Sequence, residues 1–246
     1  MEETNGTSIR IEERLNEIIA LATHDLDSPL RKLGTFIKRL EETIPPGNVD
    51  ADAYMKRINA CLEEMRAIVS SLIELEAVSG SNGYVSCNMA AVVNKVKQDL
   101  REKMEEKKAT IRLSSLPELP FDKEQCYLLY RKLIENSLKF AKPGKPLEIS
   151  IDGEKLGTEE LKARGLNSNN GYRVIVEDNG IGFDEEDAEQ IFEPFQRLHG
   201  KSAYPGSGLG LTIVKRIVEN HQGKIFAEGK GNAGSRFILL IPENQH

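Results

Sequence analysis

Apolar residues recur every three to four positions through residues 1–79. This is the period of an amphipathic α-helix with one apolar face. The pattern stops at residues 44–48, where the sequence Ile-Pro-Pro-Gly-Asn cannot continue a helix. Residues 1–79 are therefore predicted to form two long helices joined by a short turn. The first apolar stripe comprises Ile11, Leu15, Ile18, Ala22, Leu26, Leu30, Leu33, Ile37 and Leu40, and the second comprises Met55, Ile58, Leu62, Met65, Val69, Leu72 and Leu75.

A single helical hairpin leaves part of each apolar stripe exposed to water. Two hairpins that pack together as a dimeric four-helix bundle would bury both stripes. The alternative is an intramolecular pair of helices that the rest of the chain covers. We expect the dimer.

The pattern changes after residues 80–84, whose glycine, serine and asparagine content is typical of a linker. Residues 85–246 are predicted to form one α+β domain, with helices packed against a mostly antiparallel sheet. The stretch from Gly153 to Gly171 is interpreted as a polar loop without an assigned role. Strands are expected at 84–87, 110–114, 147–151, 172–177, 224–228 and 235–241, and helices at 88–108, 122–140 and 209–221.

Charge and composition exclude several classes of protein. Residues 1–80 hold 9 Lys and Arg against 15 Asp and Glu, and residues 81–246 hold 24 of each. This acidic first third argues against a nucleic-acid-binding surface there. The three cysteines have no metal-like spacing, so reduced thiols are expected. The apolar runs are too short to span a bilayer, and no secretory signal is visible. We expect a cytoplasmic segment without membrane contact of its own, within a longer sensor or fed by another subunit.

His24 lies two residues from the stripe residues Ala22 and Leu26. On a helix this spacing turns its side chain about 200° from each of them, toward the polar face. A plain surface histidine fits that position equally well. However, Asp25 can accept a hydrogen bond from one ring nitrogen, which leaves the other as a neutral nucleophile. Pro29 removes a backbone N–H and loosens the helix beside this site.

Two segments of the predicted α+β domain carry residues suited to a nucleotide. Asn136 and Lys139 share one helix face. The amide oxygen of Asn136 can bind Mg²⁺ together with phosphate oxygens, and Lys139 supplies a positive charge. Asp178 follows an apolar strand and can accept the adenine amino proton, while Gly180 and Gly182 let the backbone approach a flat base. The plain alternatives are a polar helix face and an ordinary turn.

A third segment, Gly206-Ser207-Gly208-Leu209-Gly210, leads directly into a predicted helix. Such a loop offers backbone N–H groups and a positive helix end to phosphate oxygens. It is not a Walker A loop, because no Gly-Lys-Ser/Thr follows. It also opens no βαβ unit, which weakens a dinucleotide interpretation.

Together these motifs resemble those of sensor histidine kinases, including phytochrome-like members. The string His24-Asp25-Leu26-Asp27-Ser28-Pro29-Leu30 resembles the phospho-acceptor box of the dimerisation hairpin. Residues 133–140, ending in Phe140, and the segments at Asp178 and Gly206 resemble the N, G1 and G2 boxes. Phe192-Glu193-Pro194-Phe195 resembles the F box. The resemblance implies a four-helix-bundle hairpin followed by an α/β-sandwich ATP-binding domain of the GHKL (Bergerat) type.

The resemblance also implies an activity, in which His24 attacks the γ-phosphoryl group of Mg-ATP with Asp25 orienting the imidazole. An aspartate on the receiver domain of a response regulator then takes the group. Arg197 matches an arginine that reaches the γ-phosphate, Phe195 belongs to the nucleotide site, and residues 184–207 would form a lid. Ser28 occupies the position of a phosphatase residue.

One departure from the resemblance bears on the alternatives. Lys132 stands where hydrolytic relatives hold a glutamate that activates water, and a charged lysine cannot act as that base. The alternatives left open are an ATP-driven clamp of the gyrase and Hsp90 type, and a phosphotransfer adaptor without kinase activity.

Overall fold

The computed structural model describes residues 30–42, 44, 49–78, 80, 83–198, 206–229 and 231–243. The chain divides into two compact units: Met1–Ser79 with Pro205–Ser207, and Gly80–Tyr204 with Gly208–His246. The first is called the hairpin unit below and the second the α+β unit. None of the described helices combines the length and the apolar composition that a bilayer-spanning segment needs.

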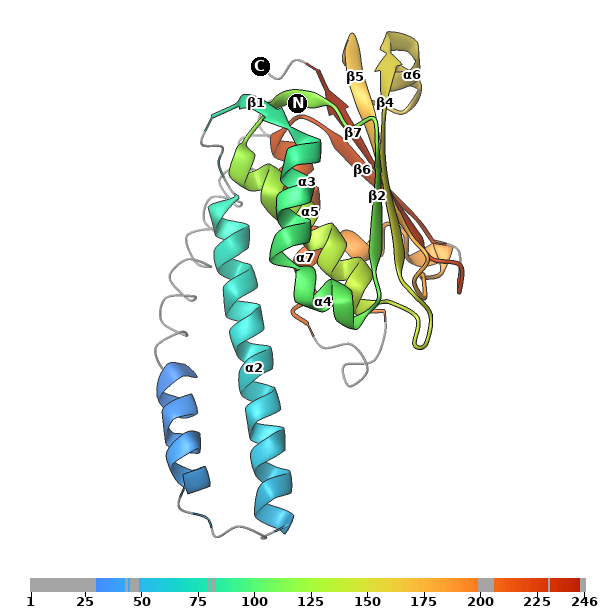
Figure 1. Cartoon of the computed structure of the whole chain (residues 1–246). Helices are drawn as coiled ribbons and strands as arrows, with labels where there is room; N and C mark the ends of the chain where they lie inside the picture. The colour runs from blue at the N-terminus through green and yellow to red at the C-terminus, as the bar shows by residue number, and fades with distance from the viewer. Residues whose placement is uncertain are drawn as a thin grey trace. The chain divides into compact units, whose positions relative to one another are not determined.

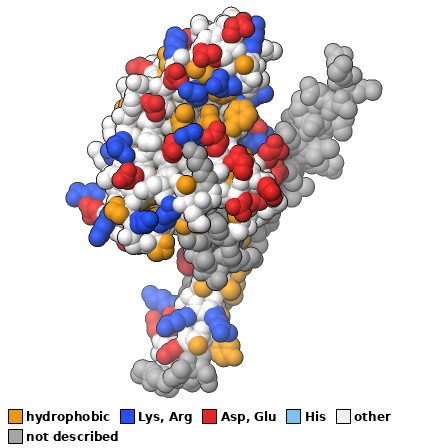
Figure 2. Space-filling view, turned by 90° about the vertical axis from the view of Figure 1, so that its right-hand side faces the viewer, with side chains coloured by type: hydrophobic (Ala, Val, Ile, Leu, Met, Phe, Trp, Pro, Cys, Tyr) orange, Lys and Arg blue, Asp and Glu red, His pale blue; other side chains and the backbone are white. Residues whose placement is uncertain are grey.

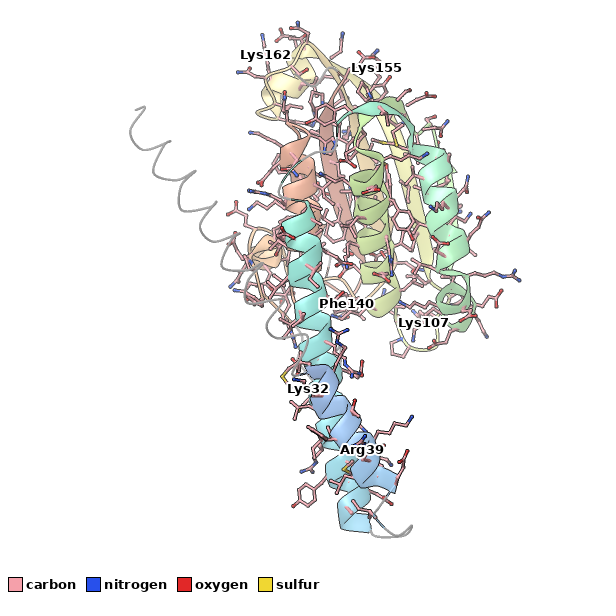
Figure 3. The ribbon with its side chains drawn as sticks, turned by 90° about the vertical axis from the view of Figure 1, so that its left-hand side faces the viewer. Lys32, Arg39, Lys107, Phe140, Lys155 and Lys162 are labelled. Carbon is pink, nitrogen blue, oxygen red and sulfur yellow. The ribbon has the colours of Figure 1, made fainter. Side chains whose placement is uncertain are left out.

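The hairpin unit contains a helix over residues 30–42 and a second helix, α2 (Val49–Ala77). They end and begin on either side of the predicted proline break, and the helical interpretation of both described segments is confirmed. Lys32 and Arg39 lie along the first of them (Figure 3). His24, Asp25 and Ser28 lie outside the described residues. The apolar side chains packed between the helices are Leu30, Ile37, Met55, Leu62 and Val69, with Ile44 against them.

Only part of each apolar stripe is buried in this unit. The buried apolar residues of α2, Met55, Leu62 and Val69, are seven positions apart, whereas the intervening Ile58 and Met65 are 41% and 42% exposed. On the first helix Leu33 and Leu40 are 46% and 51% exposed. Burial of such side chains stabilises a fold by about 1.5–3 kcal/mol each. A single hairpin therefore leaves an apolar face available for association.

The α+β unit is built on a five-stranded sheet in the order β2-β4-β5-β7-β6. Only β2 and β4 are parallel, so the mostly antiparallel prediction is confirmed. Helices α3, α5 and α7 cover one face of the sheet (Figure 1). A two-stranded sheet of β1 and β3 completes the unit. The strands are β1 (Val85–Asn88), β2 (Thr110–Ser114), β3 (Glu118–Phe121), β4 (Glu148–Gly157), β5 (Asn170–Asp178), β6 (Lys224–Gly229) and β7 (Ser235–Pro242), and the helices are α3 (Met89–Asp99), α4 (Arg101–Glu106), α5 (Lys123–Lys139), α6 (Thr158–Ala163) and α7 (Gly210–Asn220).

Side-chain caps start two of these helices where the sequence predicted. Asn88 accepts a hydrogen bond from the backbone N–H of Ala91 at the start of α3. Asp122 accepts from the N–H groups of Glu124 and Gln125 at the start of α5. Such caps satisfy donors that have no partner within the helix. The predicted continuous helix over 88–108 is wrong, because the chain turns at Leu100, which is buried there, and continues as α4.

The predicted polar loop between Gly153 and Gly171 is also wrong. Strand β4 runs on to Gly157, α6 follows, and β5 starts at Asn170. Gly153 lies within β4, paired with Val174 of β5. A Cβ atom there would lie 2.7 Å from the carbonyl oxygen of Ser115, so this strand position needs glycine. The segment folds because Leu156, Leu161, Leu166 and Leu240 form a second small core.

This second core lies on the face of the sheet that α3, α5 and α7 leave open. Leu240 and its neighbour Leu239 in β7 necessarily point to opposite faces. Acidic and basic side chains are interspersed over this side (Figure 2). Arg236, for example, pairs with Glu177 at 2.9 Å and Glu228 at 3.0 Å. Lys155 in β4 and Lys162 in α6 lie at one end of the α+β unit, away from Phe140 at the end of α5 (Figure 3).

His221, which follows α7, is fully buried. Its Nε2 accepts a hydrogen bond from the N–H of Asp122, and its Nδ1 lies 2.7 Å from the carbonyl oxygen of Ile217. The ring stacks on Phe121 at 3.4 Å between centroids. Burial lowers the pKa of His221, against smaller opposing effects of the Ile217 carbonyl and Asp122. The neutral ring therefore joins α7 to the start of α5.

We expect acid to destabilise the fold through His221. Because its pKa is lowered in the folded state, the unfolded chain binds the proton first. Stability is then complete above the ordinary pKa of 6.5 and falls as the pH drops below it. Urea denaturation between about pH 7.5 and about pH 5 measures this fall. His221→Gln should be less stable at neutral pH with a flatter pH profile, and an equally steep profile would assign the effect to other groups.

Candidate functional site

A pocket in the α+β unit lies where the end of α5, the chain after β5 and the start of α7 converge. Its volume is about 110 Å³, below the roughly 300 Å³ at which sites for drug-sized ligands begin. The lining residues are Asn136, Lys139, Phe140, Gly182, Phe183, Ile191, Gln196, Arg197, Leu198, Gly208, Gly210, Leu211, Ser235 and Phe237.

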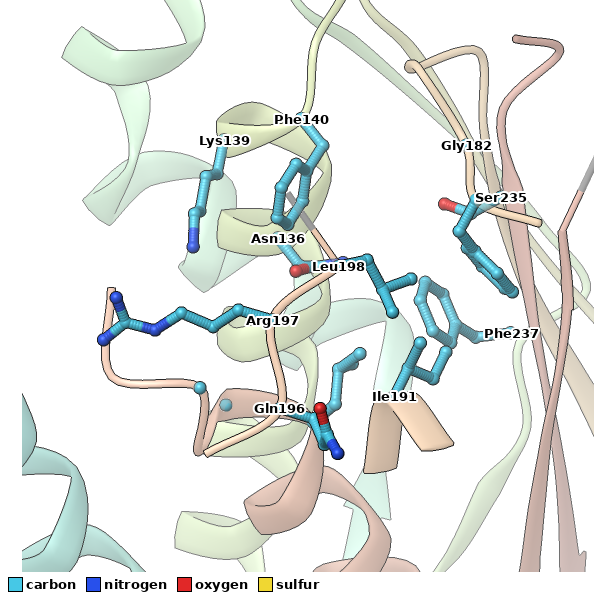
Figure 4. Close-up of a pocket in the computed structure, with 14 residues that line it drawn as sticks. Asn136, Lys139, Phe140, Gly182, Ile191, Gln196, Arg197, Leu198, Ser235 and Phe237 are labelled. Atoms are coloured by element: carbon cyan, nitrogen blue, oxygen red, sulfur yellow. The ribbon is translucent and has the colours of Figure 1, made fainter. Parts of the chain in front are cut away.

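One side of the pocket is cationic. The side chains of Lys139 and Arg197 extend on the same side in Figure 4. Burial lowers the pKa of Lys139, and the positive charge of Arg197 lowers it further. The Lys139 ammonium lies 4.8 Å from the centroid of the Phe140 ring. Two cations that destabilise each other make a favourable place for an anion, because a bound phosphate relieves the repulsion.

The other side of the pocket is apolar. Ile191, Leu198 and Phe237 lie together there, with Asn136 between them and the two cations (Figure 4). Ser235 and Gly182 close this side. A pocket with an apolar region, a neutral amide and a cationic end fits a ligand that has a flat ring at one end and phosphates at the other.

Asp178, at the end of β5, does not line the pocket but is hydrogen-bonded to Ser235, which does. The carboxylate is 5% exposed. Its Oδ2 accepts from Ser137 at 3.0 Å and from Ser235 at 2.6 Å, and its Oδ1 accepts from the N–H of Gly180 at 2.8 Å. Each carboxylate oxygen has two acceptor positions. Oδ1 therefore has one acceptor position that these three hydrogen bonds do not use.

The turn after Asp178 packs backbone against backbone. A Cβ atom on Gly180 would lie 2.7 Å from the carbonyl oxygen of Phe140. Gly182 has φ +68°, and a Cβ atom there would lie 2.6 Å from the carbonyl oxygen of Gly234. The N–H of Ile181 donates to the Phe140 carbonyl at 3.0 Å. Glycine is needed at both positions to hold this turn against α5 and β7.

Phe195 and Gly208, the two ends of the segment 195–208, are in backbone contact. The N–H of Phe195 donates to the carbonyl oxygen of Gly208 at 3.1 Å. Gly208 has φ +76°, and a Cβ atom there would lie 2.8 Å from the carbonyl carbon of Phe195. Phe195 itself has φ +65° and is 57% exposed. At Gly210, the first residue of α7, a Cβ atom would have no neighbour within 4 Å, which leaves open space at the helix end.

The pocket brings together seven of the predicted nucleotide-site residues. They are Asn136, Lys139, Phe140, Gly182, Arg197, Gly208 and Gly210. Asp178, Gly180, Phe195 and Leu209 do not line the pocket but adjoin residues that do. Gly206 and Ser207 group with the hairpin unit, and their role in a phosphate loop stays a prediction.

The first part of the predicted lid over residues 184–207 is folded against the α+β unit. Residues 185–187 and 190–192 form short 3₁₀ turns, and Ile191 and Phe192 are buried against the unit. Their apolar character anchors the first part of the segment. Sequence reasoning also missed Ser137, Ser235 and Gly234. Ser137 lies within the 133–140 motif but was given no role there, and Ser235 opens β7 outside any of the motifs.

Gly234 offers a test of this arrangement. Its φ is +108°, and a Cβ atom would overlap the carbonyl oxygen of Asp178, at 1.9 Å. We expect Gly234→Ala to lower the free energy of unfolding by at least about 2 kcal/mol. Urea denaturation measures the loss. Gly157→Ala is the matched control, because Gly157 has φ −85° and open space around it. Equal stability of the two variants would contradict the close approach.

Comparison with known proteins identifies the family. Residues 121–245, just over half of the chain, match the family of histidine kinase-, DNA gyrase B- and HSP90-like ATPases. The chain belongs to this family. The match covers the pocket described above, from α5 to β7. The α+β unit is therefore an ATP-binding domain. The resemblance of its sequence motifs to those of histidine kinases is confirmed.

Two relatives extend the similarity beyond the matched domain. The phytochrome-like protein Cph1 of Synechocystis sp. is 30% identical over 93% of this chain and 29% of its own length. The sensor histidine kinase YclK of Bacillus subtilis is 26% identical over 95% of this chain and 48% of its own length. The chain therefore spans less than half the length of these relatives. Both alignments include residues on the N-terminal side of the ATPase domain.

Solved structures share the fold. Full-length ShkA in complex with AMPPNP has a TM-score of 0.66 at 18% identity, covering 94% of this chain and 46% of that chain. The histidine kinase ThkA in complex with the response regulator protein TrrA has a TM-score of 0.59 at 22% identity, covering 95% of this chain and 64% of that chain. The predicted α+β architecture, with a helical hairpin before an ATP-binding domain, is confirmed at this level.

Proposed function

We propose that this chain is the kinase core of a sensor histidine kinase. It phosphorylates its own His24 from Mg-ATP and passes the phosphoryl group to an aspartate of a response regulator. The observation that carries the proposal is the two-ended pocket of the α+β unit, with the Lys139 and Arg197 cations at one end and the Asp178 carboxylate beside the other. The family membership and the similarity to YclK support the kinase assignment.

In this proposal the adenine ring enters the apolar side and donates its amino proton to Oδ1 of Asp178. Gly180 and Gly182 let the backbone approach the ring, beside Phe140. Lys139, Arg197 and the N–H groups of the Gly206–Gly210 loop, including Ser207 and Leu209, hold the phosphates. Phe195 fixes the base of that loop.

Asn136 would hold Mg²⁺. Among the described residues no group of three or more His, Cys, Asp or Glu side chains could hold a metal ion. The amide oxygen of Asn136 is sufficient for Mg²⁺ that arrives with ATP, because the ion keeps several waters and needs few protein ligands besides phosphate oxygens. When bound, it neutralises charge that develops on the phosphates.

The transfer step requires an in-line approach of His24 to the γ-phosphorus. Its Nε2 forms the N–P bond while the bond from phosphorus to the β–γ bridging oxygen breaks and ADP leaves. Asp25 orients the imidazole through the other ring nitrogen. Positioning and charge neutralisation provide most of the rate. Lys132 disfavours direct hydrolysis, because it replaces a carboxylate that would activate water.

The hairpin unit would form a homodimer, since the apolar side chains that a single hairpin leaves exposed can pack against the same side chains of a second copy. In domain terms, residues 1–79 would dimerise and carry His24, residues 80–84 would link, and residues 85–246 would bind ATP. ThkA in complex with TrrA supports a receiver domain as the partner. Ser28 would then be the candidate for assisting dephosphorylation of that partner. Use of ATP implies a reaction in the cytoplasm.

Incubation with γ-labelled ATP and Mg²⁺ tests the proposal. A kinase acquires a stable, acid-labile label and transfers it to a receiver domain. A clamp of the gyrase and Hsp90 type would release phosphate steadily without labelling itself, and an adaptor would not bind ATP. Either result would overturn the assignment.

A further inference from the structure

A groove on the α+β unit lies apart from the nucleotide pocket. The last turn of α3, the short helix α4 and the start of β2 form it, and its volume is about 490 Å³. This volume falls within the roughly 300–1,000 Å³ that ligand sites in proteins occupy. The groove and the nucleotide pocket have no lining residue in common.

The groove is positively charged. Lys97, Arg101 and Lys108 line it, against one carboxylate, that of Glu105. Glu105 pairs with Arg101 at 2.8 Å. Within the part of the chain that the structure describes, neither Lys97 nor Lys108 has an ion-pair partner. Two ammonium groups are therefore open to an anionic ligand.

Lys108 occupies a backbone position that favours glycine. Its φ is +48°. The N–H of Ala109 donates to the carbonyl oxygen of Met104 at 2.8 Å, so Lys108 is the left-handed residue that ends α4. A side chain at such a position costs stability relative to glycine. The end of the helix therefore does not require a lysine, whose side chain lines the groove instead.

Strand β2 starts in this groove and has one edge without a strand partner among the described residues. The sheet order places β2 at the end of the sheet, paired with β4. The N–H of Thr110 donates to the carbonyl oxygen of Leu147, on the β4 side, at 2.8 Å. Because alternate residues of a strand direct their backbone groups to opposite edges, the N–H and C=O groups of Ile111 and Leu113 point away from β4.

The backbone of this edge can accept another strand. Thr110–Ser114 contains no proline, and its register with β4 continues without a bulge. Arg112, the one charged residue of the strand, pairs with Glu148 of β4 at 2.9 Å. An extended chain can therefore add to β2 by main-chain hydrogen bonds with Ile111 and Leu113.

We propose that the groove and the outer edge of β2 together bind an extended, acidic peptide segment of a partner protein. The main chain of the segment pairs with β2, and its Asp or Glu side chains enter the groove beside Lys97, Arg101 and Lys108. The positive charge selects an acidic segment over a basic one. A nucleic acid would satisfy the cations but cannot pair with the strand. The inference does not depend on the proposed kinase function, because the groove lies outside the nucleotide pocket.

Fluorescence anisotropy tests the proposal on the full chain. The probe is a fluorescein-labelled peptide of about eight alternating glutamate and valine residues, which is long enough to span β2. We expect it to bind saturably. A peptide with lysine in place of glutamate should bind at least about tenfold more weakly. The glutamate peptide with alternate N–H groups methylated should lose about as much, because it has fewer donors for the strand edge.

Lys108→Gly separates binding from stability. Glycine suits the left-handed position, so this variant should unfold at a higher urea concentration than wild type. It should nevertheless bind the glutamate peptide about three- to tenfold more weakly, because one cation of the groove is lost. Lys107→Ala is the matched control, since Lys107 is the neighbouring lysine but does not line the groove. Its affinity should stay within about twofold of wild type.

Several results would overturn the proposal. One is no binding of the glutamate peptide by wild type, and another is equal binding of the lysine peptide. Equal binding of the methylated peptide would exclude strand pairing. Tighter binding of a single-stranded oligonucleotide than of the glutamate peptide would assign the groove to nucleic acid. Lys108→Gly that binds as tightly as Lys107→Ala would place the peptide elsewhere.

Discussion

Replacing His24 by glutamine should reduce incorporation of labelled γ-phosphoryl groups to background. Glutamine keeps polar atoms in the side chain but has no nucleophilic ring nitrogen, so no N–P bond forms. Nucleotide affinity should stay within about twofold of wild type, a change of only about 0.4 kcal/mol, because the substitution changes none of the residues proposed to bind ATP. Gel autoradiography measures the label, and calorimetric titration with ATP measures the affinity.

His246→Gln is the matched control, since it makes the same chemical change at the last position of the sequence. This variant should retain the wild-type label. Acid should release the label, whereas alkali should not, as is characteristic of phosphohistidine. Label that persists on His24→Gln would move the acceptor to another residue and remove the phospho-acceptor role from the hairpin.

Replacing Asp178 by asparagine should weaken ATP binding by about 10- to 150-fold. This range corresponds to the loss of one hydrogen bond to a charged group, about 1.5–3 kcal/mol. The amide also places a donor where Ser137, Ser235 and the N–H of Gly180 all donate to the carboxylate. At least one of these donors then lacks an acceptor. Titration with ATP measures the loss of affinity, and a urea denaturation curve measures the accompanying loss of stability.

Asp152→Asn makes the same change on β4 at an exposed position. Its ATP affinity and stability should match those of wild type. If Asp178→Asn bound ATP as tightly as this control, Asp178 would be a structural residue and the orientation of the base in the pocket would need revision.

Much of the fold could be predicted from periodicity and capping residues. The helix expected at 122–140 forms as α5, and the strands expected at 224–228 and 235–241 form as β6 and β7, which pair with each other. Strand β3 was missed because Pro117 and Pro120 argue against a strand. It forms nevertheless, since it pairs with β1 in a sheet of only two strands, where few ladder hydrogen bonds are required.

The nucleotide pocket was predictable where a motif brings its residues close in sequence, as at Asn136 and Lys139. It was not predictable where the contact depends on the sheet. Ser235 is 57 residues from Asp178 in the chain, and only the pairing of β5 with β7 places them opposite each other. Gly234 was missed for the same reason. It must be glycine because the backbone carbonyl of Asp178, which is distant in the sequence, leaves no room for a Cβ atom.

The bond from Phe195 to Gly208 has a consequence for the chain that lies between them. Because Phe195 and Gly208 are held together, the number of residues between Leu198 and Gly206 should have little effect on the walls of the pocket. Doubling the number of residues in a flexible loop raises the entropic cost of closing it by only about 0.6 kcal/mol. Sequences of different length could therefore be inserted between Leu198 and Gly206, changing how fast nucleotide enters and leaves while Gln196, Arg197 and Leu198 stay in the pocket wall.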